Sequence, residues 1–169
     1  FMPYIFNPDT TSNIIEQYNN PSIACFSISM WNENLSLEVA GSIKKLFPDC
    51  LIIFGGAQCP HEPTEYMDKF QFIDVCVRAE GEHAFIEILE RFIGGSGDFD
   101  GIANTSYRQG DTVKINHNTP EFTRSLDEFP SPYLTGEFDY LLNKNDHGYQ
   151  AIIETNRGCP FLCTFCYWG

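Results

Sequence analysis

The first hundred residues alternate between short apolar runs and amphipathic stretches. The apolar runs cover residues 23–30, 51–54 and 73–77, and each has the length of a strand that is buried on both faces. Apolar residues at helical spacing follow each run, and a helix end at residues 12–19 precedes the first. This order, with short connections, predicts an α/β, Rossmann-like (flavodoxin-like) parallel sheet with flanking helices.

Polar residues mark where the helices begin. Asn32 or Asn34 is expected to cap the helix that follows the first apolar run. Glu80 and Glu82 flank Gly81 at the start of a later helix, and a pair of carboxylates can also indicate acid/base chemistry. We favour the structural interpretation, because carboxylates at the amino end of a helix stabilise its free amides and its dipole.

The pattern changes after residue 97. Residues 105–108 and 112–116, around the turn at 109–111, predict a small antiparallel hairpin. A later apolar run at residues 149–154 predicts one more strand. We therefore expect three parts: an N-terminally incomplete Rossmann-type domain at 1–100, a hairpin and linker at 101–147, and the start of a further domain at 148–169.

Composition excludes some partners and locations. Ten basic and 23 acidic residues give a net charge of −13, which opposes non-specific binding to nucleic acid. No apolar run approaches the roughly 20 residues that a membrane span needs. Seven cysteines in 169 residues fit a cytoplasmic, reducing location better than secretion. Four of them lie in or beside apolar segments, where we expect buried thiols rather than ligands: Cys25, Cys50, Cys59 and Cys76.

The remaining three cysteines form a C-x3-C-x2-C pattern at the end of the chain. Cys159, Cys163 and Cys166 place three thiols within eight residues, directly after Gly158. Such spacing favours an iron–sulfur cluster that keeps one iron open, because electron-transfer clusters ordinarily use four cysteines. A structural zinc site also requires four ligands, and His147, twelve residues before Cys159, is the nearby histidine that would complete one. The zinc alternative stays open.

Together with the preceding Asn-Arg-Gly at 156–158, this loop resembles the signature loop of radical S-adenosylmethionine enzymes. The resemblance implies that the loop follows the first strand of a (β/α) barrel. It also implies that Cys159, Cys163 and Cys166 hold a [4Fe-4S] cluster, that the open iron binds S-adenosylmethionine, and that Phe165 packs near the adenine. One electron, from a donor such as a flavodoxin or ferredoxin, then cleaves the sulfonium to a radical that abstracts a substrate hydrogen.

A second motif resembles the cobalamin-binding domain that precedes many radical enzymes. Ser27-Ile-Ser29 is followed, after 25 residues, by Gly55-Gly56. The family pattern has leucine where this chain has Ser29, and a slightly longer spacer. The resemblance implies that Ser27, Ser29, Gly55 and Gly56 line the pocket for the cobalamin tail. An ordinary strand-to-helix turn explains the same residues without a ligand.

The two resemblances together imply the N-terminal part of a cobalamin-dependent radical S-adenosylmethionine enzyme, either a methyltransferase or an iron–sulfur oxidoreductase-like enzyme. It would methylate an unactivated carbon of a small-molecule substrate, or carry out a related rearrangement or cyclisation. Because the cysteine loop ends the chain, we expect no turnover from this piece alone and assign no catalytic residue. Two alternatives remain: a docking module without a corrinoid, and a zinc-binding cysteine site.

Overall fold

The structure is a computed structural model that describes residues 5, 9–118, 125–143, 152–155, 157–159, 161 and 163–166. The chain divides into two compact units, Phe1–Pro120 and Glu121–Gly169. The first unit contains the sheet, and the second contains the cysteine loop. Each unit is described by itself.

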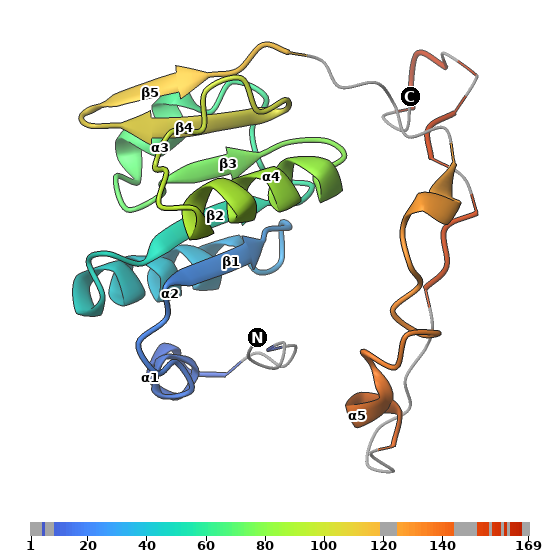
Figure 1. The fold of residues 1–169 in the computed structure, drawn as a ribbon, viewed down its shortest axis with the longest axis horizontal. Coiled ribbons are helices and arrows are strands. Elements are labelled where there is room, and N and C mark those ends of the chain that lie inside the picture. The colour runs from blue at the N-terminus through green and yellow to red at the C-terminus, as the bar shows by residue number, and fades with distance from the viewer. Residues whose placement is uncertain are drawn as a thin grey trace. The chain divides into compact units, whose positions relative to one another are not determined.

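The first unit is built on a five-stranded sheet whose strands follow chain order (Figure 1). Three strands are parallel: β1 (Ile23–Ser27), β2 (Leu51–Gly55) and β3 (Val75–Val77). The hairpin of β4 (Thr105–Gln109) and β5 (Thr112–Ile115) continues the sheet in antiparallel pairing. The predicted strands and hairpin are confirmed, and the hairpin joins the same sheet as the parallel strands.

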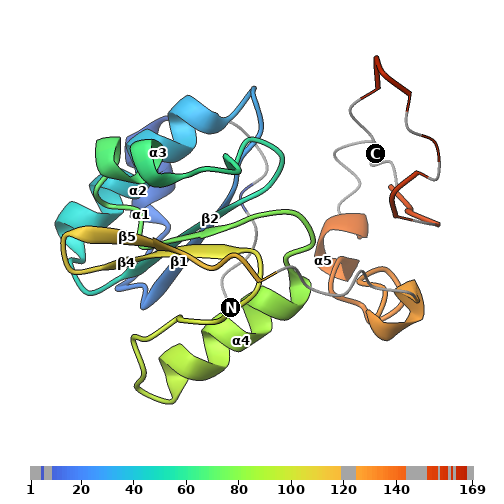
Figure 2. The same ribbon diagram turned by 90° about the horizontal axis from the view of Figure 1, so that it is seen from above.

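Helices cover both faces of this sheet, as the sequence predicted (Figure 2). On one face lie α1 (Thr11–Glu16), α2 (Glu33–Leu46) and α3 (Thr64–Lys69), and on the other lies α4 (Glu82–Ile93). Alternate strand residues feed two separate cores: Ile52 and Phe54 pack towards α2 and α3, whereas Ile53 and Val75 pack towards α4. Burying such a side chain contributes about 1.5–3 kcal/mol to folding, so the two cores stabilise the central strands from both faces of the sheet.

Asp74 joins the sheet to α2. One of its carboxylate oxygens accepts a 2.7 Å hydrogen bond from the Ile52 backbone amide and lies 2.8 Å from the Lys44 ammonium. Lys44 also donates to the Cys50 carbonyl at 2.8 Å. Because Ile52 is fully buried, the carboxylate satisfies an amide that solvent does not reach.

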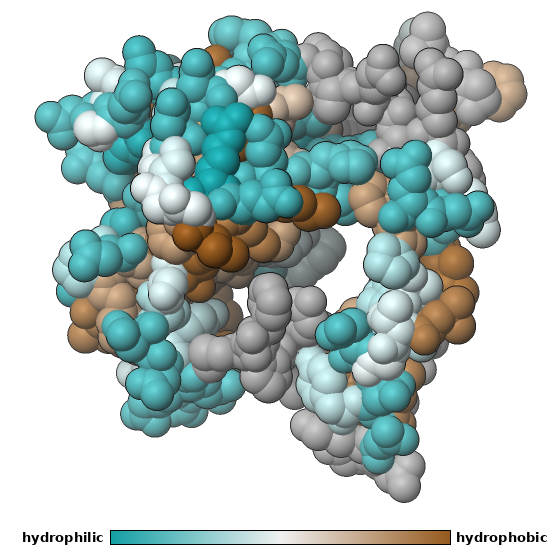
Figure 3. Space-filling model, viewed as in Figure 1, coloured by the Kyte–Doolittle hydropathy of each residue, from teal (hydrophilic) through white to brown (hydrophobic). Residues whose placement is uncertain are grey.

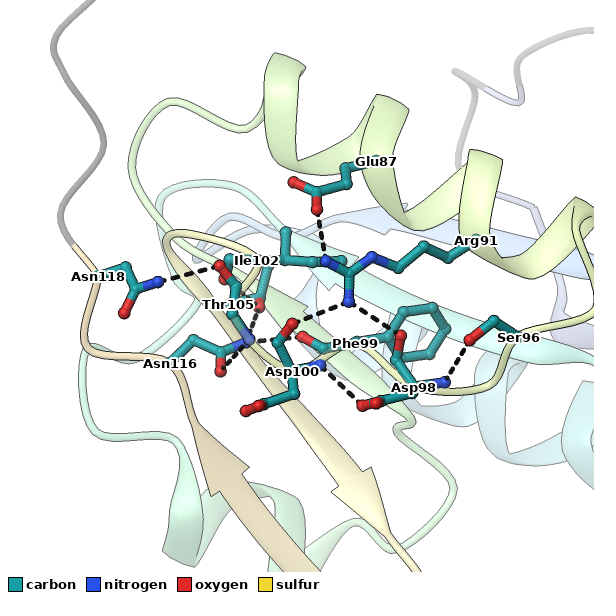
Figure 4. Close-up of polar contacts among 11 residues, drawn as sticks. Glu87, Arg91, Ser96, Asp98, Phe99, Asp100, Ile102, Thr105, Asn116 and Asn118 are labelled. Carbon is teal, nitrogen blue, oxygen red and sulfur yellow. Dashed lines mark hydrogen bonds and ion pairs between the residues drawn. The ribbon is translucent and has the colours of Figure 1, made fainter.

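A second polar network fixes the connection between α4 and β4 (Figure 4). The buried Asn116 amide donates 2.8 Å hydrogen bonds to the Phe99 carbonyl and to Thr105 Oγ1, and its oxygen accepts from the Gly101 amide at 3.0 Å. Arg91, on α4, donates to two carbonyls of the same connection. The Asn116 side chain, directly after β5, therefore ties the end of this connection and the first residue of β4 together at three points.

The second unit has little regular structure among its described residues. It contains the short helices η1 (Leu126–Glu128) and α5 (Asp139–Leu142). The Tyr133 hydroxyl accepts a 3.1 Å hydrogen bond from the Ile152 amide. Residues 152–154 have no strand assignment, and the rest of the predicted strand, at 149–151, lies outside the described residues. The barrel strand therefore stays a prediction.

The surface of the first unit is mainly polar on the side from which Figure 3 is viewed, with hydrophobic residues gathered beside α4. Two α4 side chains, Ile86 and Ile93, are exposed. Of the helices in the described ranges, none combines the length and the apolar character required to cross a bilayer.

Candidate cofactor sites

The ends of β1 and β2 meet at the two predicted cobalamin motifs. Ser27 is paired in register with Gly55. Beyond the strands, the Ile28 amide donates to the Gly55 carbonyl at 2.7 Å, and the Gln58 amide donates to the Ile28 carbonyl at 3.1 Å. The structure thus brings the Ser-x-Ser and Gly-Gly motifs together at the carboxyl edge of the parallel strands, where open α/β sheets bind their ligands.

The two glycines differ in what they require. Gly56 has φ +96°, and a β-carbon there would lie 2.7 Å from the Ile28 carbonyl oxygen and 2.9 Å from its amide nitrogen. A β-carbon at Gly55 would meet nothing closer than the Val77 carbonyl oxygen at 3.5 Å. Gly56 is therefore fixed by the packing of two backbone segments, whereas Gly55 leaves ordinary space beside it.

Two hydroxyl groups lie at this edge. Ser27 is exposed and Ser29 is half-buried. Within the part of the chain that the structure describes, neither hydroxyl has a hydrogen-bond partner. A serine hydroxyl is one donor and two acceptors, so both groups are available to a polar ligand.

Asn32 holds the turn between the two serines, and sequence reasoning missed this role. Its Oδ1 accepts from the Ser29 amide at 2.7 Å, and its Nδ2 donates to the Ser27 carbonyl at 2.9 Å. Asn32 occupies the N-cap of α2, as predicted, but its side chain makes no capping hydrogen bond. The predicted helix start is confirmed, while the amide faces back towards β1 rather than forward into the helix. An asparagine five residues after a strand-end serine is the only sequence signal of this arrangement.

The turn that Asn32 holds also carries two exposed apolar side chains. Met30 and Trp31 are 77% and 83% exposed. Their backbone lies within a hydrogen-bonded turn, because the Asn32 and Glu33 amides donate to the Ser29 carbonyl at 3.1 Å. Two consecutive large apolar residues are thus presented to the surface at the edge where both motifs end.

Arg78 fastens the next part of the same edge. It follows β3 and donates to the His61 carbonyl at 3.0 Å, to Ser106 Oγ at 2.8 Å, and to the Thr105 and Asn116 carbonyls at 3.2 Å. Four acceptors use its guanidinium, so its charge serves the architecture of the edge.

The cysteines of the first unit are mostly buried, as predicted. Cys50, Cys59 and Cys76 lie in the core, whereas Cys25 is exposed, so the prediction of a buried thiol was wrong there. Cys25 is on β1, which forms the end of the described sheet. A hydrogen bond from Cys76 lowers the pKa of Cys59, assisted by Arg78 and opposed by burial, while the same bond and burial raise the pKa of Cys76.

The cluster loop lies in the second unit. Cys159 is half-buried, and Cys163 and Cys166 are exposed. The Cys166 amide donates to the Cys163 carbonyl at 3.1 Å, Gly158 has φ +74°, and Phe165 is 91% exposed. Across the described residues, no three Cys, His, Asp or Glu side chains are gathered closely enough to hold a metal ion. Three cysteine sulfurs at this spacing suit a cluster chemically, and their convergence stays a prediction.

No protein-family model matches the chain. Curated relatives do match it. The chain is 33% identical, over 88% of its length and 22% of the relative's, to the cobalamin-dependent radical SAM methyltransferase TokK of Streptomyces tokunonensis. It is 31% identical, over its whole length and 25% of the relative's, to 2-(S-pantetheinyl)-carbapenam-3-carboxylate methyltransferase of Streptantibioticus cattleyicolor.

A more distant relative has another reaction in its name. It is the anaerobic magnesium-protoporphyrin IX monomethyl ester cyclase of Cereibacter sphaeroides, 24% identical over 72% of this chain and 20% of that protein. The chain spans about a quarter of the length of the relatives that it matches. Since the match to the carbapenam carboxylate methyltransferase extends over the whole chain, including the sheet and the cysteine loop, the chain belongs to the family of cobalamin-dependent radical S-adenosylmethionine enzymes.

Proposed function

We propose that this chain is the cofactor-binding front part of an enzyme that methylates an unactivated carbon of a small molecule. The observation that carries the proposal is the identity of 31–33% to two relatives whose names specify methyltransferases. Cyclisation or rearrangement is the second candidate, favoured by the weaker match to a cyclase.

In this proposal the sheet edge holds cobalamin. The exposed Ser27 hydroxyl and the half-buried Ser29 hydroxyl would hydrogen-bond the polar tail of the corrinoid. Gly56 would keep the Ile28 backbone and the second turn in contact, and Gly55, which has no side chain, would leave the tail room between the strand ends. The unpartnered hydroxyls at the end of a parallel sheet support this assignment.

The cysteine loop would hold the second cofactor. Cys159, Cys163 and Cys166 would ligate a [4Fe-4S] cluster, and Phe165 would pack against the adenine of S-adenosylmethionine. When bound, the cluster supplies the electron that cleaves S-adenosylmethionine, and the protein's role is to bind, orient and shield the reactants. A flavodoxin or ferredoxin in the cytoplasm would reduce the enzyme.

Retention of a corrinoid tests the first half of the proposal. The chain is incubated anaerobically with hydroxocobalamin, passed through gel filtration, and its absorbance is compared with that of the untreated chain. The proposal requires corrinoid to elute with the protein in a ratio near one. Protein that elutes colourless would instead support the docking module without a corrinoid.

A further inference from the structure

Among the residues that the structure describes, Asn32 is the one whose side chain bonds the backbone at both ends of the Ser-x-Ser motif. Its Oδ1 accepts a hydrogen bond from the Ser29 amide at 2.7 Å, and its Nδ2 donates one to the Ser27 carbonyl at 2.9 Å. One bond is exposed and the other is partly buried, so water competes with both and each adds little to the stability of the fold. Their joint effect is geometric: the amide fixes the direction in which residues 27–31 leave the strand.

We propose that Asn32 is a positioning residue for the corrinoid, which acts by holding the Ser27–Trp31 turn in its binding conformation before the ligand arrives. The inference rests on the proposed function, since it assigns the ligand of this edge to cobalamin. The ligand would contact the Ser27 and Ser29 hydroxyls, while Asn32 itself uses its donor and its acceptor on the backbone.

The rest of the turn gives this role a physical reason. Ser27, Met30 and Trp31 are exposed, so few side-chain contacts restrain the turn. A free turn would have to be ordered on binding, which costs conformational entropy for every residue that becomes fixed. A turn that is already ordered does not incur this cost when the ligand binds. Loss of the two Asn32 hydrogen bonds should therefore weaken binding without removing a ligand contact.

Trp31 makes the inference measurable. The chain has two tryptophans, and Trp168→Phe leaves Trp31 as the single indole, 83% exposed on the turn. Cobalamins absorb where tryptophan emits, so binding at this edge quenches the fluorescence of Trp31. The full chain carrying Trp168→Phe is titrated with hydroxocobalamin in three forms: Asn32 unchanged, Asn32→Asp and Asn32→Ala.

Asn32→Asp keeps the acceptor for the Ser29 amide and loses the donor to the Ser27 carbonyl, whereas Asn32→Ala loses both. We expect a Kd roughly tenfold higher for Asn32→Ala and an intermediate value for Asn32→Asp, since about 1.4 kcal/mol corresponds to a factor of ten. Asn13→Ala is the matched control. Asn13 is an exposed asparagine on α1 whose Nδ2 donates to Asp9 Oδ1 at 2.8 Å. Its replacement by alanine should leave the Kd unchanged.

Two further readouts separate positioning from general stability. The urea midpoint of Asn32→Ala should differ little from that of Asn13→Ala, whereas amide exchange at Ser29 should accelerate only in Asn32→Ala. Equal Kd values for Asn32→Ala and the parent, or unchanged exchange at Ser29, overturn the inference and leave the proposed function standing. Absence of quenching in the parent chain overturns both.

Discussion

Gly56 and Ile28 are packed backbone against backbone, so that a β-carbon at Gly56 would lie 2.7 Å from the Ile28 carbonyl oxygen. Gly56→Ala should therefore destabilise the first unit by about 1–3 kcal/mol, through the positive φ and the forced separation of the two turns. Gly55→Ala has no such contact and should change the free energy of unfolding by less than about 1 kcal/mol. Urea unfolding of both variants measures the difference.

The same pair separates folding from ligand binding. Gly55→Ala should keep the fold and still weaken the binding of hydroxocobalamin, because the new methyl group occupies space at the edge of the proposed pocket. A Gly55→Ala chain that binds the corrinoid like the parent would remove Gly55 from the site. Equal destabilisation by the two substitutions would contradict the packing argument.

Asp74 provides a second matched comparison. Asp74→Ala leaves the buried Ile52 amide without its acceptor and Lys44 without its ion pair, so we expect a loss of about 1–3 kcal/mol. Asp74→Asn retains an oxygen for the amide and loses only the charge, so its cost should be clearly smaller. Chemical denaturation at neutral pH tests this, and equal costs would show that the ion pair, not the amide, is what matters.

The Asn116 network predicts a large effect from a single amide. Asn116→Ala removes the donor to the Phe99 carbonyl and the acceptor of the Gly101 amide, and should cost about 2 kcal/mol or more. Asn118→Ala, which removes a single exposed bond to the Gly101 carbonyl, is the control and should cost less than about 1 kcal/mol. Thermal unfolding of both variants should rank them in this order; the reverse ranking would refute it.

We expect Tyr66 to make the stability of the first unit fall at alkaline pH. Its hydroxyl donates to Glu33 Oε1 at 3.0 Å, and burial, followed by this hydrogen bond and the Glu33 charge, raises its pKa above the ordinary value of 10.0. Above pH 10 the unfolded chain releases this proton before the folded chain does, so unfolding becomes easier as the pH rises. Tyr66→Phe should therefore lose less stability than the parent between pH 9 and about 11. The free energy of unfolding of both chains is measured across this pH range. Equal losses in the two chains would contradict a raised pKa of Tyr66.

Hydrophobic periodicity predicted the parallel strands and the helices between them because β2 and β3 are buried on both faces by neighbours that are close in the sequence. It did not predict that β4 and β5 extend the sheet, since β3 and β4 pair across a 27-residue connection that leaves no local trace. The exposure of Cys25 was missed for a related reason: a strand at the end of a sheet has the same apolar sequence as a central one.

The sequence likewise predicts part of the candidate sites and not the rest. The Ser-x-Ser and Gly-Gly motifs could be placed together from sequence because strand ends of a parallel sheet share one edge. The use of the Asn32 amide could not, because an N-cap asparagine has two possible partners and only the tertiary turn selects between them. The roles of Cys159, Cys163 and Cys166 rest on spacing and family resemblance.

We propose that Cys159, Cys163 and Cys166 are the ligands of a radical-enzyme cluster. Anaerobic reconstitution with iron and sulfide, followed by iron, sulfide and zinc analysis of the parent and of a Cys159→Ala, Cys163→Ala, Cys166→Ala variant, tests it most directly. The claim predicts roughly four irons and four sulfides per parent chain and none in the variant. One zinc per chain without sulfide, or iron that the variant retains, would contradict it.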